Sequence, residues 1–126
     1  MVKINITGDC GNSPRRAFLK DFNIAFAGGD VPFIMDHVTE DVIWEMPGDR
    51  TIRGKAGMQT ALEEIKDTSM DEMTLDKIIT HGRDAAVSGR FSMQGKEYAF
   101  CDVYTFAGAK GSMLKSISSF IVKISG

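Results

Sequence analysis

The sequence predicts one α+β domain in which three N-terminal helices pack on a strongly curved antiparallel sheet. Before Thr68, apolar residues recur mainly three or four positions apart, which is helical spacing. After Thr68 the period changes to two, as expected for half-buried strands. Helices followed by a run of long strands are typical of α+β domains. A strongly curved sheet under helices forms a cone, and the open end of a cone is a pocket.

The first helix has clear start and stop signals. Ser13 is a capping hydroxyl, and Pro14 suits the first helical position. The helix is expected to run to about Ala27 and to end at the glycines of positions 28–29. One apolar stripe along it contains Phe18, Phe22 and Phe26.

Two further helices follow. Asp30 caps a short second helix with Pro32 in its first turn. The third helix is expected over residues 55–67, where apolar side chains recur at helical spacing. Residues 1–12 form an N-terminal arm or a short strand. The strands are expected at residues 41–46, 51–53, 73–81, 85–93, 97–106 and 113–124.

The strand at residues 97–106 carries the most informative pattern. Its alternate residues on one face are Tyr98, Phe100, Asp102, Tyr104 and Phe106. Asp102 is the single carboxylate of this aromatic face, and a carboxyl among rings either has a partner or holds its proton. It is therefore a candidate acid or base, with a shape-holding structural role as the alternative. Tyr104 is a candidate donor, either to a ligand oxygen or to Asp102.

Further residues are expected to line a ligand pocket. Candidates for ligand binding are Phe22, Phe26, Trp44, Met46, Phe100, Ser118 and Phe120. In the last strand, Ser118 and Phe120 share the expected inward face with Leu114. A shift of one residue in register would turn that face outward.

The opposite sheet face is too apolar to stand in water as one patch. Its residues are expected to be Ala99, Cys101, Val103, Ile117 and Ile121. A two-fold homodimer with the sheets packed face to face would cover it.

Composition limits the possible partners. The net charge is −2, so there is no basic footprint for nucleic acid. No apolar run is long enough to cross a bilayer and no signal-peptide core is visible, so a cytoplasmic location is expected. Cys10 and Cys101 are expected to be reduced thiols. No cofactor and no metal are expected, because phosphate-loop, dinucleotide and zinc-ligand patterns are absent.

The order of short motifs resembles a known superfamily. The motifs are AFAGGD at 25–30, VTEDVIWEMPGD and IRGKAGM within 38–58, and FCDVYTFAGAKG at 100–111. Together they resemble the NTF2-like superfamily of cystatin-like fold, and within it the SnoaL-like and ketosteroid-isomerase-like proteins. The resemblance covers nearly all of residues 13–124 and implies that residues 1–126 are a single SnoaL-like domain.

The resemblance can be tested against the family's chemistry. Steroid isomerases use an Asp base with an oxyanion hole made of a Tyr and a protonated Asp. The matching positions here are Met46, Phe22 and Asp102, so the base and the Tyr are absent and steroid isomerase chemistry is not expected. The similar limonene-epoxide hydrolases need an Asp, Arg, Tyr and Asn cluster. Arg90, Tyr104 and Asp102 match it in part, but no second pocket carboxylate is evident.

Two hypotheses remain from the sequence. In the first, the protein is a cofactor-independent isomerase, cyclase or hydrolase that binds a small apolar, carbonyl-bearing or enol-like molecule, and Asp102 moves a proton. In the second, the same fold binds a small hydrophobic ligand or another protein without chemistry. The substrate is not specified by either reading, because one scaffold hosts unrelated sites.

Overall fold

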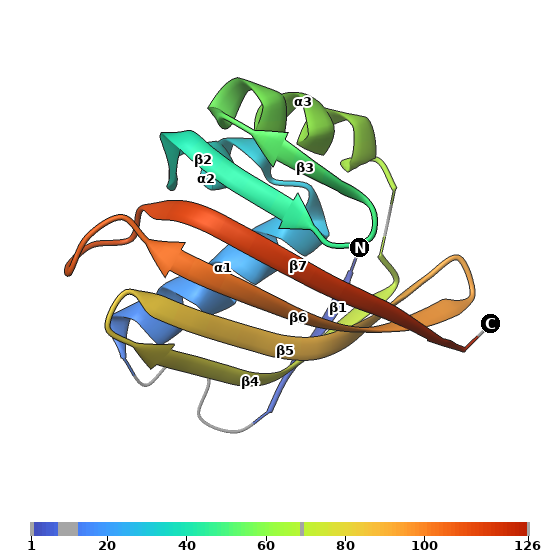
Figure 1. Ribbon diagram of the computed structural model, residues 1–126. Coiled ribbons are helices and arrows are strands. Elements are labelled where there is room, and N and C mark those ends of the chain that lie inside the picture. Colours follow the sequence, from blue (N-terminus) through green and yellow to red (C-terminus); the bar gives the residue numbers. More distant parts are fainter. Residues whose placement is uncertain (1, 8–12, 69, 126) are drawn as a thin grey trace.

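A computed structural model describes residues 2–7, 13–68 and 70–125, which form a layer of helices over one seven-stranded sheet (Figure 1). The helices are α1 Pro14–Gly28, α2 Val31–Met35 and α3 Lys55–Ile65. The strands are β1 Lys3–Ile6, β2 Val38–Met46, β3 Arg50–Arg53, β4 Glu72–His81, β5 Asp84–Met93, β6 Lys96–Phe106 and β7 Leu114–Ser125. The fold is therefore α+β, and the number of helices in the described part matches the prediction.

The predicted helix caps are confirmed. The Arg16 backbone N–H donates to the Ser13 hydroxyl at 3.3 Å, and Gly29 ends α1 in the left-handed conformation with φ of 74°. The Phe33 backbone N–H donates to the Asp30 carboxylate at 3.3 Å at the start of α2. No helix in the described ranges is both long and apolar enough to cross a bilayer.

The sheet has the strand order β1-β4-β5-β6-β7-β2-β3. Its centre, from β4 to β7, is antiparallel, as is the β2–β3 hairpin. The prediction of a wholly antiparallel sheet is wrong, because β1 pairs with β4 and β2 pairs with β7 in parallel. Part of the expected N-terminal arm is thus an edge strand, while residues 8–12, including Cys10, lie outside the described part.

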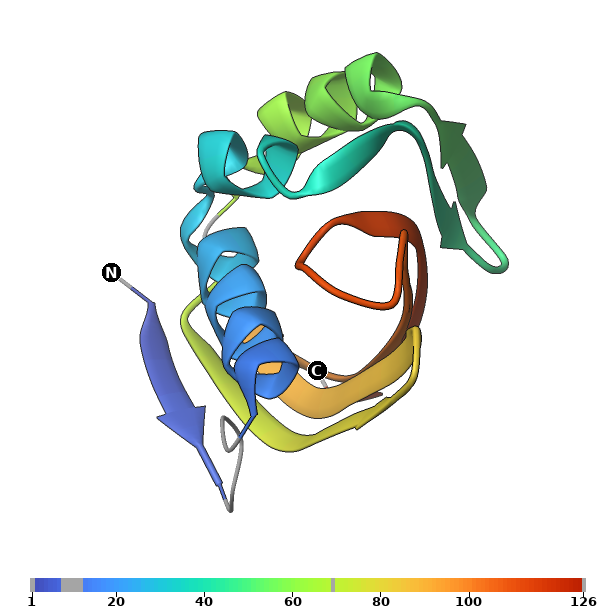
Figure 2. The ribbon, with the colours of Figure 1, turned by 90° about the vertical axis from the view of Figure 1, so that its left-hand side faces the viewer.

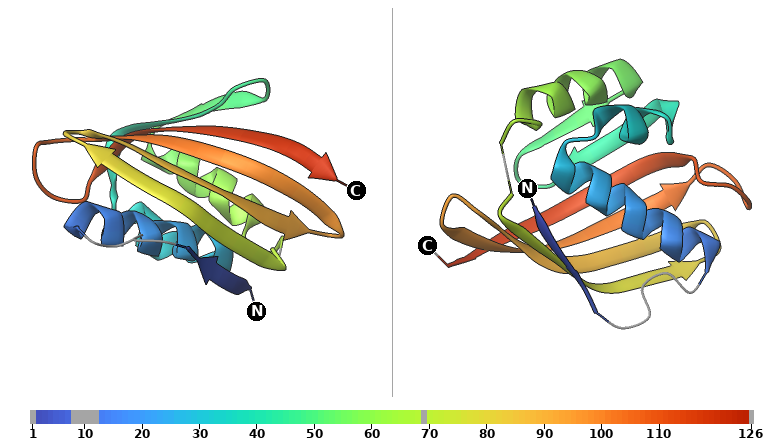
Figure 3. Two further views of the ribbon diagram at one scale, coloured as in Figure 1. Left: turned by 90° about the horizontal axis from the view of Figure 1, so that it is seen from below. Right: turned by 180° about the vertical axis from the view of Figure 1, so that it is seen from behind.

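The sheet bends around α1 but is not strongly curled, so the expected cone forms only in part. Figure 2 shows α1 within the bend, and Figure 3 shows it lying across the sheet from behind. The alternation predicted for β6 is confirmed, because Phe100, Tyr104 and Phe106 are all buried. The helices and this face of the sheet enclose one apolar core.

An irregularity in β7 changes which residues face the core. Phe106 pairs with Leu114 while the preceding Thr105 pairs with Ser116, so Lys115 is an extra residue in β7. Leu114 and Ile117 are therefore both buried, although they are three positions apart. Strict alternation from Leu114 would instead have buried residue 116.

Two expectations for β7 are consequently wrong. Ser118 faces outward, where its hydroxyl donates to the exposed Glu45 carboxylate at 3.3 Å. Phe120 also faces outward and is 47% exposed. Ile117 and Ile121, expected on the outer face, lie on the concave face instead: Ile117 is buried and Ile121 borders a pocket there.

The close approach of β4 to β5 requires a glycine at position 89. A Cβ at Gly89 would collide with the Thr74 carbonyl oxygen and lie 3.0 Å from Cε1 of Phe100, its cross-strand partner. We predict that Gly89→Ala lowers the free energy of unfolding by about 1–3 kcal/mol, measured by urea denaturation. The matched control is Gly28→Ala, where a Cβ meets nothing within 4 Å and a stability equal to or above the wild type is expected. Equal effects of the two substitutions would contradict this packing.

Candidate functional site

A pocket opens on the concave face between α1, β2 and the centre of the sheet. Its inner part, the inner pocket, has a volume of about 70 Å³ and borders a deeper space of about 20 Å³. The inner pocket is lined by Asn23, Phe26, Trp44, Met70, Met73, Phe91, Phe100, Asp102, Ser119 and Ile121. The inner pocket has room for a small functional group or a few waters, since one water needs about 10–15 Å³ of such volume.

A wider space, the outer pocket, adjoins the inner pocket and shares Phe26, Trp44 and Ile121 with it. It has a volume of about 390 Å³ and a largely apolar lining that includes Met46 and Leu62. The two pockets together have an apolar entrance and a single carboxyl in the described inner lining, a combination typical of small-molecule sites.

Asp102 is positioned by its strand and by two hydroxyls. It lies in β6 directly opposite Ser119 of β7, and the Ser119 side chain hydrogen-bonds to it. The Tyr104 hydroxyl, two residues along the same strand and buried, donates to Asp102 Oδ2 at 3.3 Å. Successive odd and even residues of a strand face opposite sides, so Asp102 and Tyr104 necessarily share the concave face.

The environment of Asp102 raises its pKa. Burial is the largest cause, because a desolvated carboxyl favours the neutral form, and it raises the pKa to about 6. The hydrogen bonds from Ser119 and Tyr104 act in the opposite direction, since donors stabilise the carboxylate. Burial beside Asp102 also raises the pKa of the Tyr104 hydroxyl well above its ordinary value. Asp102 can therefore exchange a proton near neutral pH, while Tyr104 stays protonated.

Aromatic side chains form the walls around Asp102. The Trp44 indole N–H donates to the Ser119 hydroxyl at 3.0 Å, and its ring meets Phe26 edge to face at 5.8 Å. The rings of Phe91 and Phe100 lie 6.0 Å apart on the sheet side. These rings account for the low polarity that keeps Asp102 desolvated.

The structure brings most of the candidate residues together. Phe26, Trp44, Phe100 and Asp102 line the inner pocket, Phe22 and Tyr104 line the deeper space, and Met46 lines the outer pocket. Ser118 and Phe120 lie on the other face of the sheet.

Two polar residues of the site were not expected from the sequence. Asn23 on α1 is buried, and its amide donates to the Leu19 carbonyl at 2.8 Å and to the Tyr104 hydroxyl at 3.2 Å. Its signal was present: Asn23 is a polar residue four positions after Leu19, on the apolar stripe of the helix. Ser119 had no such signal, because its orientation depends on the irregularity in β7.

The pocket offers no evident metal centre. Within residues 2–7, 13–68 and 70–125, no group of three or more His, Cys, Asp or Glu side chains is arranged to hold a metal ion. Cys101 is a free thiol on the outer face of β6, next to Asp102 in sequence.

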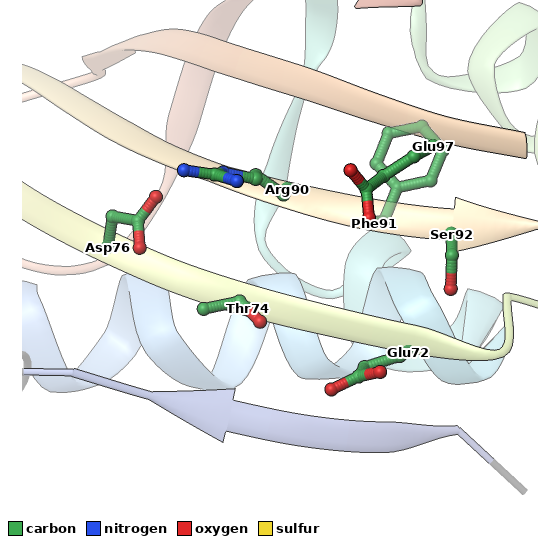
Figure 4. Close-up of a pocket in the computed structure, with 7 residues that line it drawn as sticks. All are labelled: Glu72, Thr74, Asp76, Arg90, Phe91, Ser92 and Glu97. Atoms are coloured by element: carbon green, nitrogen blue, oxygen red, sulfur yellow. The ribbon is translucent and has the colours of Figure 1, made fainter. Parts of the chain in front are cut away.

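A second hollow lies on the outer face of the sheet, with a volume of about 320 Å³ (Figure 4). Its lining is mainly polar and consists of Glu72, Thr74, Asp76, Arg90, Phe91, Ser92 and Glu97. Asp76, Arg90 and Glu97 are exposed, so their charges are hydrated. The concave pocket is the stronger candidate site because, of the two hollows, only this one has a carboxyl, Asp102, whose partial burial raises its pKa.

Comparisons with known proteins agree with this architecture. The family model of the SnoaL-like domain matches residues 18–112. No curated protein matches the chain at a significant level.

Solved structures extend the likeness at the level of the fold. A candidate ketosteroid isomerase from Kribbella flavida has a TM-score of 0.74 and 17% identity, over 89% of this chain and 80% of that chain. An LEH-like epoxide hydrolase from M. tuberculosis has a TM-score of 0.71 and 14% identity, over 84% of this chain and 76% of that chain. An NTF2-like protein of unknown function from Cytophaga hutchinsonii has a TM-score of 0.68 and 20% identity, over 84% and 97%. At these identities the likeness shows the NTF2-like fold alone.

The raised pKa of Asp102 makes the stability of the protein depend on pH. The folded carboxyl binds its proton more tightly than the unfolded one, so Asp102 destabilises the fold progressively as the pH rises through 4 to 6. We predict that Asp102→Asn gains stability relative to the wild type between pH 4 and pH 7, by at most about 3 kcal/mol. Urea denaturation of both proteins at each pH measures this difference. A difference that stays constant with pH would contradict a raised pKa.

Proposed function

The chain belongs to the family of SnoaL-like domains, and from this premise we propose that it binds a small apolar molecule and that Asp102 moves a proton on it. The observation that carries the proposal is the position of Asp102, the single ionised carboxyl among the described residues of the inner pocket, beside aromatic walls. Its pKa of about 6 suits proton transfer near neutral pH.

The shape of the pocket supports one orientation of the ligand. The outer pocket has the volume for an apolar body, whereas the inner pocket has room only for a polar end group. A ligand bound in this way places its reactive end beside Asp102, and its body against Met46 and Leu62. Burial of apolar surface then provides the binding free energy, at about 25 cal/mol per Å².

A cofactor-independent isomerase, cyclase or hydrolase fits this arrangement. A ketosteroid isomerase mechanism of the usual kind is not proposed, because Met46 and Phe22 stand at the positions of its base and its tyrosine, and neither exchanges a proton. Any proton transfer here depends on Asp102 with Tyr104 as the neighbouring donor.

A non-catalytic binding protein is the second candidate. The observation that favours it is the single carboxyl: no other acid or base lines the inner pocket within the described ranges. Proton relocation by one group remains feasible, but a reaction that needs a separate acid and base does not.

The experiment exposes the purified protein to an apolar small-molecule extract of its own host and weighs the complex by native mass spectrometry. We predict a bound molecule for the wild type and for Ser118→Leu, whose side chain faces outward, and none for Ser119→Leu, which fills the inner pocket. An enzyme converts the bound molecule and loses this turnover by at least about 100-fold in Asp102→Asn. A non-catalytic binder leaves the bound molecule unchanged in both the wild type and Asp102→Asn. Equal binding by the two leucine variants would contradict the proposed site.

We also propose a homodimer through the outer face of β6 and β7. The apolar patch there consists of the half-buried Ala99 and Cys101 and of the exposed Val103, Phe120 and Val122. Phe120 and Val122 replace the expected Ile117 and Ile121. Exposed fractions of 40% for Val103, 47% for Phe120 and 62% for Val122 favour burial against a second copy.

Analytical ultracentrifugation tests the dimer. We expect a two-subunit species for the wild type, and a monomer for Phe120→Lys because a buried charge without a partner prevents association. Met113→Lys is the matched control, since Met113 is 39% exposed in the loop before β7 and outside the patch. A monomeric wild type, or a dimeric Phe120→Lys protein, would contradict this interface.

A further inference from the structure

We infer that Asn23 and Trp44 are positioning residues which direct two hydroxyl protons onto Asp102 and so fix it as a hydrogen-bond acceptor. Two short chains of hydrogen bonds end on this carboxyl. One runs from Asn23 through Tyr104, and the other runs from Trp44 through Ser119. They come from four elements, α1, β6, β2 and β7.

The direction of the first chain is set by a backbone carbonyl. The Leu19 carbonyl can only accept, so the Asn23 side chain must turn its NH₂ group toward it, at 2.8 Å. The second hydrogen of that NH₂ group then points at the Tyr104 hydroxyl oxygen, 3.2 Å away. Because the Tyr104 oxygen accepts from Asn23, its own hydrogen is available for Asp102 Oδ2, 3.3 Å away.

The direction of the second chain is set by an indole. The Trp44 ring nitrogen can only donate, so the Ser119 oxygen, 3.0 Å away, must accept. The hydroxyl hydrogen of Ser119 then turns to Asp102, its cross-strand partner. No buried side-chain polar atom of the described residues is left without a partner, so this assignment satisfies both hydroxyls.

Among the described residues of the inner pocket, no charged side chain offers Asp102 another partner. The titratable groups beside it are the Tyr104 hydroxyl and the Cys101 thiol of the outer face. The inner-pocket residues from α1, β2, β4, β5 and β7 carry no charge in the described part, and Asp49, Arg50 and Lys66 line the outer pocket but not the inner one. The two hydroxyls are thus the groups that stabilise the carboxylate.

The acceptor role of Asp102 limits which ligand groups can bind beside it, a step that rests on the proposed function. A carboxylate has about four lone-pair sites, of which the two hydroxyls occupy two. The remaining sites favour a ligand group that presents a hydrogen: a hydroxyl, an N–H or an acidic C–H beside a carbonyl. In the last case Asp102 takes the proton from carbon, leaving an enolate on the ligand, and returns the proton in the second step. The resemblance to steroid isomerases implied the opposite, a protonated donor at this position.

The test is made on the ligand-free protein, so its failure is separate from failure of the binding experiment above. Carbon-detected NMR follows the Asp102 carboxyl through a pH titration in the wild type, Trp44→Phe, Ser119→Ala and the double variant. Loss of the Ser119 donor is expected to raise the Asp102 pKa by about one unit. Trp44→Phe is expected to raise it by a smaller amount in the wild type, and by nothing further in Ser119→Ala. The other chain is expected to show the same pattern. Tyr104→Phe raises the Asp102 pKa, and Asn23→Leu raises it by a smaller amount and by nothing further in Tyr104→Phe.

Three results would overturn the inference. An equal effect of Trp44→Phe with and without Ser119 would show that the indole acts through packing alone. A fall in the Asp102 pKa in Ser119→Ala or Tyr104→Phe would show that Asp102 donates. A second readout needs no pocket variant that could fail to fold: the Trp44 indole N–H resonance of the wild type should titrate together with the Asp102 carboxyl. An indole resonance that does not follow that titration would also overturn the inference.

Discussion

The register of β7 determines what the pocket contains. With Lys115 as an extra residue, Ile117, Ser119 and Ile121 take the concave face, and Ser118 and Phe120 take the outer face. A slip of one residue in a strand exchanges all of its side chains between faces. Without the irregularity, Ser118 would stand opposite Asp102 in place of Ser119, and Phe120 would stand opposite Phe100 in place of Ile121. The pocket would then gain a phenylalanine ring where it now has an isoleucine. The same irregularity places Phe120 on the apolar outer patch.

The parts of the fold that follow from local chemistry were predictable from the sequence. The caps at Ser13 and Asp30, the stop at Gly29 and the alternation of β6 each depend on residues within a few positions of one another. The parallel pairing of β2 with β7 was not predictable, because it joins segments about seventy residues apart and leaves no local pattern. The modest bend of the sheet is likewise a property of all seven strands together.

The residues of the candidate site also differ in whether a local sequence pattern could predict them. Asp102 and Tyr104 share a strand, so period-two spacing was enough to put them on one face. Their partners lie on other elements, and only Asn23 left a trace, as an amide within an apolar helical stripe. Ser119 could not be distinguished from Ser118 by sequence, since β7 carries adjacent serines and the irregularity precedes them. Chemistry within one element was therefore readable, whereas the hydrogen bonds between elements were not.

Two opposing effects act on Asp102, and their balance gives the site its character. Desolvation alone can raise a buried carboxyl to a pKa of about 8–9, and full hydration leaves an aspartate near 3.9. The hydroxyls of Tyr104 and Ser119 offset part of the desolvation and leave the pKa at about 6. Near neutral pH the carboxylate dominates, while the acid form is separated from it by only about 1–2 kcal/mol. The proton transfer proposed for this site uses a group held close to its point of proton exchange and beside a space large enough for a ligand. The same position carries a cost in stability, because an apolar residue would stabilise the core more.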